Sequence, residues 1–262
     1  MDILIYIKKN MRRLLCKTTW GYRLYYKRDH HVTGPHGVPD APWHNAVMTS
    51  QSQVEGCLAQ VHKLGLPPVR ESSKNWDTLA ALDLILKTTK PQSRILDAGG
   101  ERYSMLLPWL ALYGYKNLKA RNLVFSKNKV KQGPIEYSYG DITATEFADN
   151  EFDGITCLSV IEHGVELSAY FEEMGRILKT GGSLITSADY FEDPVDTRGQ
   201  IAYGVPIHIF NKGEIEDAIK LAGEYGLQLI SPIDLHSEEK VVHWKPYNLY
   251  YTYVVFTLRK HS

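Results

Sequence analysis

Short apolar runs alternate with amphipathic stretches along the chain from residue 94 onward. The runs are rich in β-branched and aromatic residues, as is typical of buried strands, and the stretches between them repeat apolar residues at helical spacing. We therefore expect strands at residues 95–97, 118–125, 135–139, 152–159, 183–187, 227–233 and 249–258, and helices at residues 103–113, 167–178 and 212–225. This alternation predicts an α/β fold with a mostly parallel sheet and helices on both faces.

The first third of the chain has a different pattern. Residues 1–28 mix apolar and basic side chains, which favours an amphipathic helix that covers the domain or, less favoured, lies on an anionic membrane or a partner. Residues 29–45 carry three prolines and two glycines and predict an irregular arm. Helices are then expected at residues 46–64 and 76–88. We divide the chain into an N-terminal helical arm and linker, residues 1–70, and an α/β domain, residues 71–262.

Composition narrows the function classes. The 262 residues carry 30 basic and 30 acidic side chains, so the net charge is zero and nucleic acid is not an expected partner. The three cysteines have no metal-binding or redox spacing, which favours a reducing compartment and predicts a cytoplasmic location. No run approaches the roughly 20 apolar residues that span a bilayer, and no signal peptide is expected. No metal site is predicted, because the early histidines have no partner at ligand spacing.

Residues 93–104, SRILDAGGERYS, combine a strand, a glycine turn and the start of a helical pattern. Asp97 stands at the end of the strand, and Gly99 and Gly100 allow a sharp turn and close approach of a ligand to the backbone. The helix that follows would face the ligand with unpaired N–H groups. This is the first half of a nucleotide-binding βα unit, although the same residues are also compatible with a plain strand-to-helix turn.

Four stretches in order then resemble the class I S-adenosylmethionine-dependent methyltransferases: ILDAGG, YGDITATEFADNEFDGITCLSVIEH, MGRILKTGGSLITS and PIHIFNKGEIEDAIKLAGEYGLQL. The resemblance extends over about two-thirds of the chain, from about Ser93 to Lys260. The resemblance implies a doubly wound, seven-stranded Rossmann-like sheet whose last strand runs antiparallel, and S-adenosyl-L-methionine as cofactor.

The resemblance also implies which residues contact the cofactor. They are Asp97, Gly99, Gly100, Asn122, Asp141, Ile142, Leu158 and Ser159. Asn122 stands where the family usually has an acidic residue for the ribose hydroxyls, and Glu101 and Tyr103 stand where it has glycines. An amide can accept from a hydroxyl and can also donate, so Asn122 changes the electrostatics of this position.

Methyl transfer to a neutral acceptor benefits from a general base, and His163 and His208 are the catalytic candidates. Both could instead hold loops through hydrogen bonds. The polar stretch 189–206 predicts a substrate-binding loop in which Asp189, Tyr190 and Tyr203 contact a polyhydroxylated or amine-bearing small molecule; a solvated lid is the alternative.

The expected activity is methyl transfer to an O or N atom of a small molecule, with a sugar or polysaccharide precursor as the preferred acceptor. The alternative is a catalytically inactive module that keeps the fold for binding or regulation, tethered by its basic N-terminal helix. Cofactor affinity distinguishes these two functions.

Overall fold

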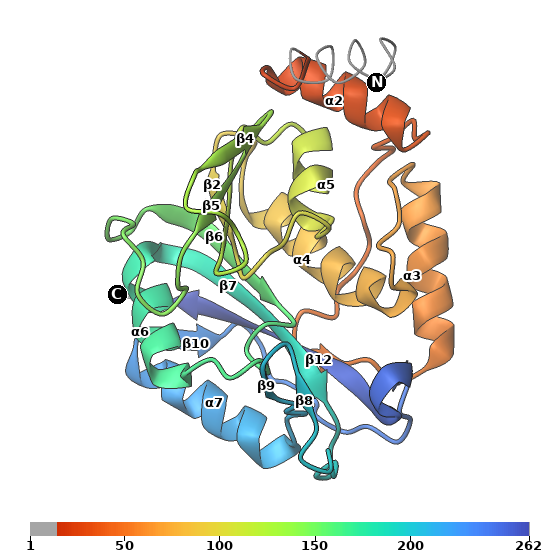
Figure 1. The fold of residues 1–262 in the computed structure, drawn as a ribbon, viewed down its shortest axis with the longest axis vertical. Helices are drawn as coiled ribbons and strands as arrows, with labels where there is room; N and C mark the ends of the chain where they lie inside the picture. The colour runs from red at the N-terminus through yellow and green to blue at the C-terminus, as the bar shows by residue number, and fades with distance from the viewer. Residues whose placement is uncertain (1–14, 262) are drawn as a thin grey trace.

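A ten-stranded sheet forms the centre of the molecule, with helices on both faces (Figure 1). The computed structural model describes residues 15–261. The strands are β1 Ala46–Val47, β2 Arg94–Ala98, β3 Asn117–Asn122, β4 Val130–Gln132, β5 Ile135–Tyr139, β6 Phe152–Leu158, β7 Leu178–Tyr190, β10 Leu227–Leu229, β11 Val242–Trp244 and β12 Leu249–Lys260, and β8 Ile201–Ala202 and β9 Val205–Pro206 form a separate hairpin. The helices are α2 Thr19–Asp29, α3 Gln51–Lys63, α4 Asn75–Thr88, α5 Leu106–Leu112, α6 Leu167–Ile177 and α7 Lys212–Glu224, with short 3₁₀ helices η1 Ser72–Lys74 and η2 Lys245–Tyr247.

Five strands, in the order β5-β3-β2-β6-β7, pair in parallel. The antiparallel strand β12 follows on β7, and β10 pairs with β12. These seven strands form the sheet that the sequence predicts, including its antiparallel last strand, so the predicted fold class is confirmed. The short strands β1, β4 and β11 extend the sheet to ten.

The sheet separates two hydrophobic cores. Along β2, Ile95 belongs to the core with helices α3, α4 and α5, and Leu96 belongs to the core with α6 and α7. Ile185 and Leu184 of β7 divide in the same way. Because successive side chains point to opposite faces, strands buried on both faces need the continuous apolar runs that the sequence contains.

Several predicted boundaries differ from the structure. Residues 46–47 form β1 against β12, and the predicted helix starts only at Gln51. Helix α5 starts at Leu106, because residues 101–105 continue the turn after β2. Strand β7 pairs with β12 as far as Tyr190, so Asp189 and Tyr190 lie in a buried strand and the expectation that they lie in a loop is wrong. Backbone pairing with β12 outweighs the polar sequence there.

The described part of the N-terminal arm packs against the α/β body. Thr18 caps α2, and Arg23 of this helix donates from Nε to the Ala111 carbonyl of α5 at 2.6 Å. Residues 1–14 of the expected amphipathic helix lie outside the described residues. Among residues 15–261, no helix has both the length and the apolar character needed to cross a membrane. The division of the chain at residue 70 stays a prediction.

Candidate active site

The glycine turn after β2 has no room for larger residues. Gly99 has φ +83°, and its N–H donates to the Arg121 carbonyl at 2.8 Å. A Cβ on Gly99 would overlap the Val160 side chain, and a Cβ on Gly100 would overlap the Asp97 carboxylate. The two glycines therefore let the turn fold directly over Asp97 at the carboxyl end of the strand.

Asp97 is buried beneath this turn. Its Oδ1 accepts a hydrogen bond from the Thr156 hydroxyl of β6 at 2.8 Å. Burial raises the pKa of Asp97 to about 7, against the opposing effect of the Thr156 hydrogen bond. The carboxylate is thus held at the junction of β2 and β6, where it can pair with a hydroxyl or ammonium group of a ligand.

Asn122 ties the loops after β2 and β3 together. Its Nδ2 donates to the Gly99 carbonyl, and its Oδ1 accepts from the Val124 N–H at 3.0 Å. A carboxylate could not donate to the Gly99 carbonyl. The replacement of the family's usual acidic residue by Asn122 therefore has a local structural reason.

Asp141 and Ile142 follow β5. The Asp141 Oδ1 accepts from both the N–H and the hydroxyl of Thr143 at 2.8 Å, which fixes an Asx turn. Ile142 is buried in the core beneath, and Leu158 is half-buried at the end of β6. All the predicted cofactor contacts thus lie at the carboxyl ends of neighbouring parallel strands, where ligands bind in sheets of this kind.

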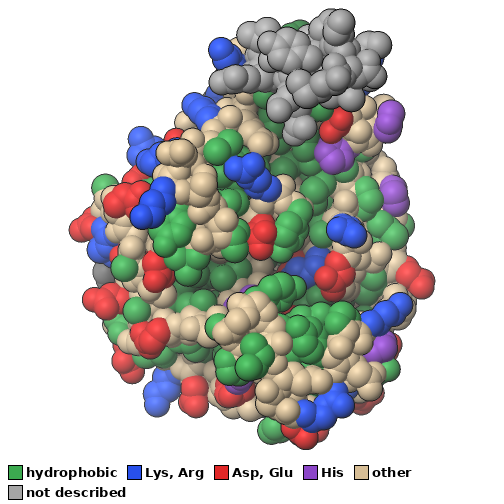
Figure 2. All heavy atoms as spheres, viewed as in Figure 1, with side chains coloured by type: hydrophobic (Ala, Val, Ile, Leu, Met, Phe, Trp, Pro, Cys, Tyr) green, Lys and Arg blue, Asp and Glu red, His purple; other side chains and the backbone are tan. Residues whose placement is uncertain are grey.

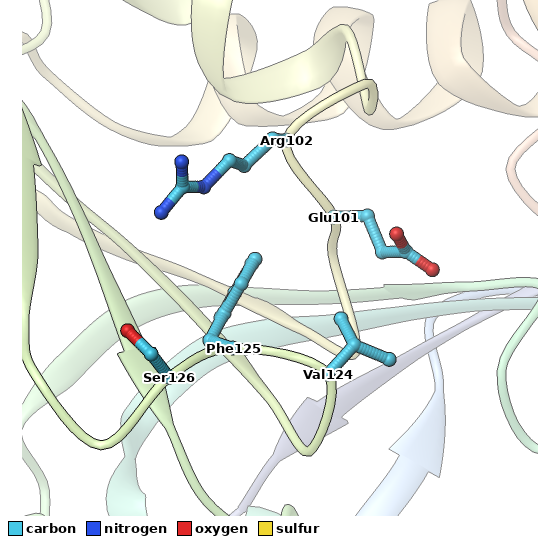
Figure 3. Close-up of a pocket in the computed structure, with 5 residues that line it drawn as sticks. All are labelled: Glu101, Arg102, Val124, Phe125 and Ser126. Carbon is cyan, nitrogen blue, oxygen red and sulfur yellow. The ribbon is translucent and has the colours of Figure 1, made fainter.

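A surface hollow of about 290 Å³ opens beside the glycine turn (Figure 3). Its lining residues come from the loops after β2 and β3: Glu101, Arg102, Val124, Phe125 and Ser126. Arg102 lies over the side of the hollow where Phe125 and Ser126 lie, whereas the Glu101 carboxylate points the other way (Figure 3). Glu101 accepts a hydrogen bond from the Tyr103 hydroxyl at 3.1 Å, so its charge is directed away from Arg102.

Lys74 of η1 reaches the neighbouring ends of β6 and β7. Its ammonium group pairs with Asp77 and donates to the Ser159 hydroxyl, and it lies 4.3 Å from the centre of the Tyr253 ring. Burial would lower the pKa of Lys74, but the nearby acids Asp77, Glu162 and Asp189 together outweigh burial, so the pKa lies above the ordinary value. Lys74 is therefore a fixed cation.

Glu162 is the most unusual side chain of this region. It is 2% exposed, and neither carboxylate oxygen has a hydrogen-bond partner among the described residues. Burial raises its pKa to about 7, and Lys74 opposes the shift; the Ser159 side chain and nearby backbone amides also oppose it without reaching hydrogen-bonding geometry. Buried polar atoms without partners are rare in native proteins and often mark functional sites.

Asp189 lies beside Glu162. It is 6% exposed, and its pKa is raised well above the ordinary value, first by burial and then by the charge of Glu162. We call Glu162, Asp189 and the Lys74–Asp77 pair the acidic cluster. On the face seen in Figure 2, a hollow lies above the β8–β9 hairpin with acidic and basic side chains at its rim.

The predicted catalytic histidines lie in different surroundings. The His163 ring is 5.4 Å from the Tyr203 ring, and its pKa is lowered by burial and by Lys74. His208 instead lies 3.4 Å from Glu214 of α7 and packs against Phe210. His163 thus belongs with the acidic cluster, whereas these contacts of His208 belong to the start of α7.

The predicted substrate residues are also separated. Tyr190 is fully buried, and its hydroxyl donates to the Leu235 carbonyl, so it is not placed to contact an acceptor. Tyr203 is 82% exposed on the hairpin, next to His163.

The sequence did not predict the role of Lys74, which donates to Ser159, 85 residues further along the chain. The only signal for Glu162 was its place beside His163.

Part of the sequence and the overall fold are similar to those of known methyltransferases. Residues 104–186 match the family model described as "Methyltransferase domain". Geranyl diphosphate C-methyltransferase from Streptomyces coelicolor A3(2) superposes with a TM-score of 0.53, at 14% identity, over 91% of this chain and 98% of that one. A geranyl diphosphate methyltransferase solved with its cofactor superposes with a TM-score of 0.51, at 16% identity, over 88% and 98% of the two chains. The matched methyltransferase domain and the fold of these structures agree with the resemblance to the class I S-adenosylmethionine-dependent methyltransferases.

Curated relatives match shorter stretches. Sterol 24-C-methyltransferase of Neurospora crassa is 25% identical over 118 residues, which are 43% of this chain and 31% of that protein. Demethylmenaquinone methyltransferase of Bacteroides fragilis is 43% identical over 51 residues, which are 20% and 21% of the two chains. The chain thus spans a third or less of the length of these relatives.

Proposed function

We propose that the protein transfers a methyl group from S-adenosyl-L-methionine to an O or N atom of a small-molecule acceptor. The observation that carries this proposal is the glycine turn folded over a buried carboxylate. Gly99 and Gly100 leave the backbone open to a ligand, and Asp97 and Asn122 fix the turn from below.

The chemistry of the side chains fits this cofactor. By the resemblance, Asp97 and the half-buried Asn122 would contact its amino acid and ribose groups, and the Asp141 Oδ2, which takes neither bond from Thr143, would suit the adenine amino group. When bound, the cofactor supplies a methyl group on a positively charged sulfur. The residues of the chain hold it, align the acceptor and exclude water.

Glu162 is better placed than His208 to act as general base. A buried carboxyl with a pKa of about 7 can take a proton from an acceptor at neutral pH, and His163 is the next residue in the chain.

The acceptor is proposed to be a small molecule. The relatives include enzymes named for transfer to carbon, so a sugar or polysaccharide precursor rests on the polar loop alone. A cytoplasmic location remains part of this proposal.

Calorimetric titration with S-adenosylmethionine and S-adenosylhomocysteine tests the function. We expect micromolar binding that is lost in Asp97→Ala and retained in Gly56→Ala, an exposed helical glycine with nothing within 4 Å of an added Cβ. A folded protein that binds neither ligand would overturn the enzyme assignment. Binding without turnover on any acceptor would support the alternative of a regulatory module.

A further inference from the structure

The acidic cluster holds three buried carboxyl groups, those of Asp77, Glu162 and Asp189, beside the one ammonium group of Lys74. Lys74 is the cation that acts on both Glu162 and Asp189, and it is already paired with Asp77 and hydrogen-bonded to Ser159. Glu162 therefore keeps two buried oxygens without a partner among residues 15–261. Ionised carboxyls are not buried in this way unless they are paired, protonated or bound to a ligand. A ligand with a positive charge would complete the cluster.

The surroundings of the cluster also favour a cation. Tyr251 is a buried neighbour of Asp189, and the Tyr253 hydroxyl donates to a further acid, Glu71, at 2.8 Å. The Tyr253 ring already holds the Lys74 ammonium group over its face. Aromatic faces and carboxylates together are the groups that bind organic cations. The exposed Tyr203 ring extends these aromatic surroundings next to His163.

We propose that the acceptor is an amine, held as its ammonium form by Glu162 and Asp189, and that its nitrogen receives the methyl group. This inference rests on the proposed function and names its substrate class. The ammonium nitrogen gives a proton to the Glu162 carboxylate, and the freed lone pair forms the new bond to the methyl carbon. The electron pair of the broken carbon–sulfur bond stays on sulfur, which becomes neutral. The methylated amine leaves as an ammonium ion, and Glu162 then releases its proton to solvent.

A neutral acceptor explains the cluster less well. A hydroxyl group can donate only one hydrogen bond, so it would leave one of the two Glu162 oxygens without a donor. An ammonium group donates up to three hydrogen bonds and supplies the missing charge. Among the described residues, no group of three or more metal-ligating side chains offers a metal ion as the alternative.

The test compares benzylamine with benzyl alcohol, its neutral isostere. Each is titrated calorimetrically into protein saturated with S-adenosylhomocysteine. We expect benzylamine to bind at least tenfold more tightly than benzyl alcohol. Glu162→Gln and Asp189→Asn should each remove that preference and leave the affinity for S-adenosylhomocysteine within threefold. Glu172→Gln makes the same change of charge at an exposed position of α6 and should keep the preference.

Three results would overturn the inference. One is equal affinity for benzylamine and benzyl alcohol, and another is no binding of benzylamine up to roughly 10 mM, a Kd that corresponds to less than about 3 kcal/mol of binding free energy. The third is a large loss of S-adenosylhomocysteine binding in Glu162→Gln, since the carboxylates would then hold the amino group of the cofactor. If the wild-type protein does not bind S-adenosylhomocysteine at all, the proposed function itself fails.

Discussion

The two halves of the sheet's carboxyl edge differ in how well their polar groups are satisfied. At the ends of β2, β3 and β5, the polar side chains are hydrogen-bonded within the protein. Asp97 accepts from Thr156, Asn122 donates to the Gly99 carbonyl, and Asp141 accepts from Thr143. At the ends of β6 and β7, Glu162 has no hydrogen-bond partner among the described residues, and Asp189 is buried beside it. The polar groups of the first half are paired within the protein, whereas the second half holds buried acids, of which Glu162 has no partner in the described part of the chain.

This difference separates two tasks. A cofactor is always the same molecule, so its half of the site can be preformed by backbone turns and short hydrogen bonds. The proposed amine acceptor would be held by charge and then released, and the buried acids would supply that charge at a cost in folding stability. We therefore expect substitutions in the first half to affect cofactor affinity, and those in the second half to affect stability and acceptor binding.

The largest expected effect is on stability, in Glu162→Gln. Because the pKa of Glu162 is raised from 4.5 to about 7 in the folded state, its ionisation opposes folding, and stability is lost as pH rises through that range. The loss of unfolding free energy between pH 4.5 and 8 should be smaller in Glu162→Gln by about 3 kcal/mol. Urea unfolding at several pH values measures it. Equal losses in the two proteins would contradict a raised pKa of Glu162 in the folded state.

Gly100→Ala should weaken cofactor binding strongly. The new Cβ would overlap the Asp97 carboxylate and displace it from Thr156. We expect the affinity for S-adenosylhomocysteine to fall by roughly a hundredfold, or about 3 kcal/mol. Gly56→Ala makes the same chemical change in α3 and should leave affinity unchanged. Retained affinity in Gly100→Ala would mean that the turn is not the cofactor site.

Asn122→Asp tests the hydrogen bond by which Asn122 joins the loops after β2 and β3. Aspartate is the chemistry expected of the family at this position, but here it would place a carboxylate against the Gly99 carbonyl. We expect the affinity for S-adenosylhomocysteine to fall by about tenfold, the scale of one lost hydrogen bond. Asn150→Asp, in an exposed turn where the side chain accepts from Lys260, serves as the control. A gain in affinity would show that ribose contact matters more than the bridge.

His208→Gln is expected to have the smallest effect. His208 is 45% exposed and lies against Glu214, so turnover should stay within about twofold of wild type. His163→Gln, the same change beside the acidic cluster, should lower turnover by about tenfold. Formation of S-adenosylhomocysteine in the presence of acceptor measures both. A larger loss in His208→Gln would reverse the assignment of the two histidines.

The sequence predicted the cofactor half of this edge much better than the acceptor half. Strand, acid and glycines are consecutive in residues 95–100, so a local pattern was enough to place Asp97 and its turn. Lys74 and Tyr251 reach the acidic cluster from η1 and β12, and only the folded sheet brings these distant segments together. Tyr190 was placed in a loop because its neighbours are polar, whereas pairing of β7 with β12 decides its position.

The most direct test of the two-part site is titration of S-adenosylhomocysteine into Glu162→Gln and Asp97→Ala side by side. Both substitutions remove one buried carboxylate at the same edge of the sheet, and they differ in the half that they affect. The cofactor should bind Glu162→Gln with an affinity within threefold of wild type, and binding to Asp97→Ala should be lost. Loss of binding in Glu162→Gln, or its survival in Asp97→Ala, would contradict the division of the site.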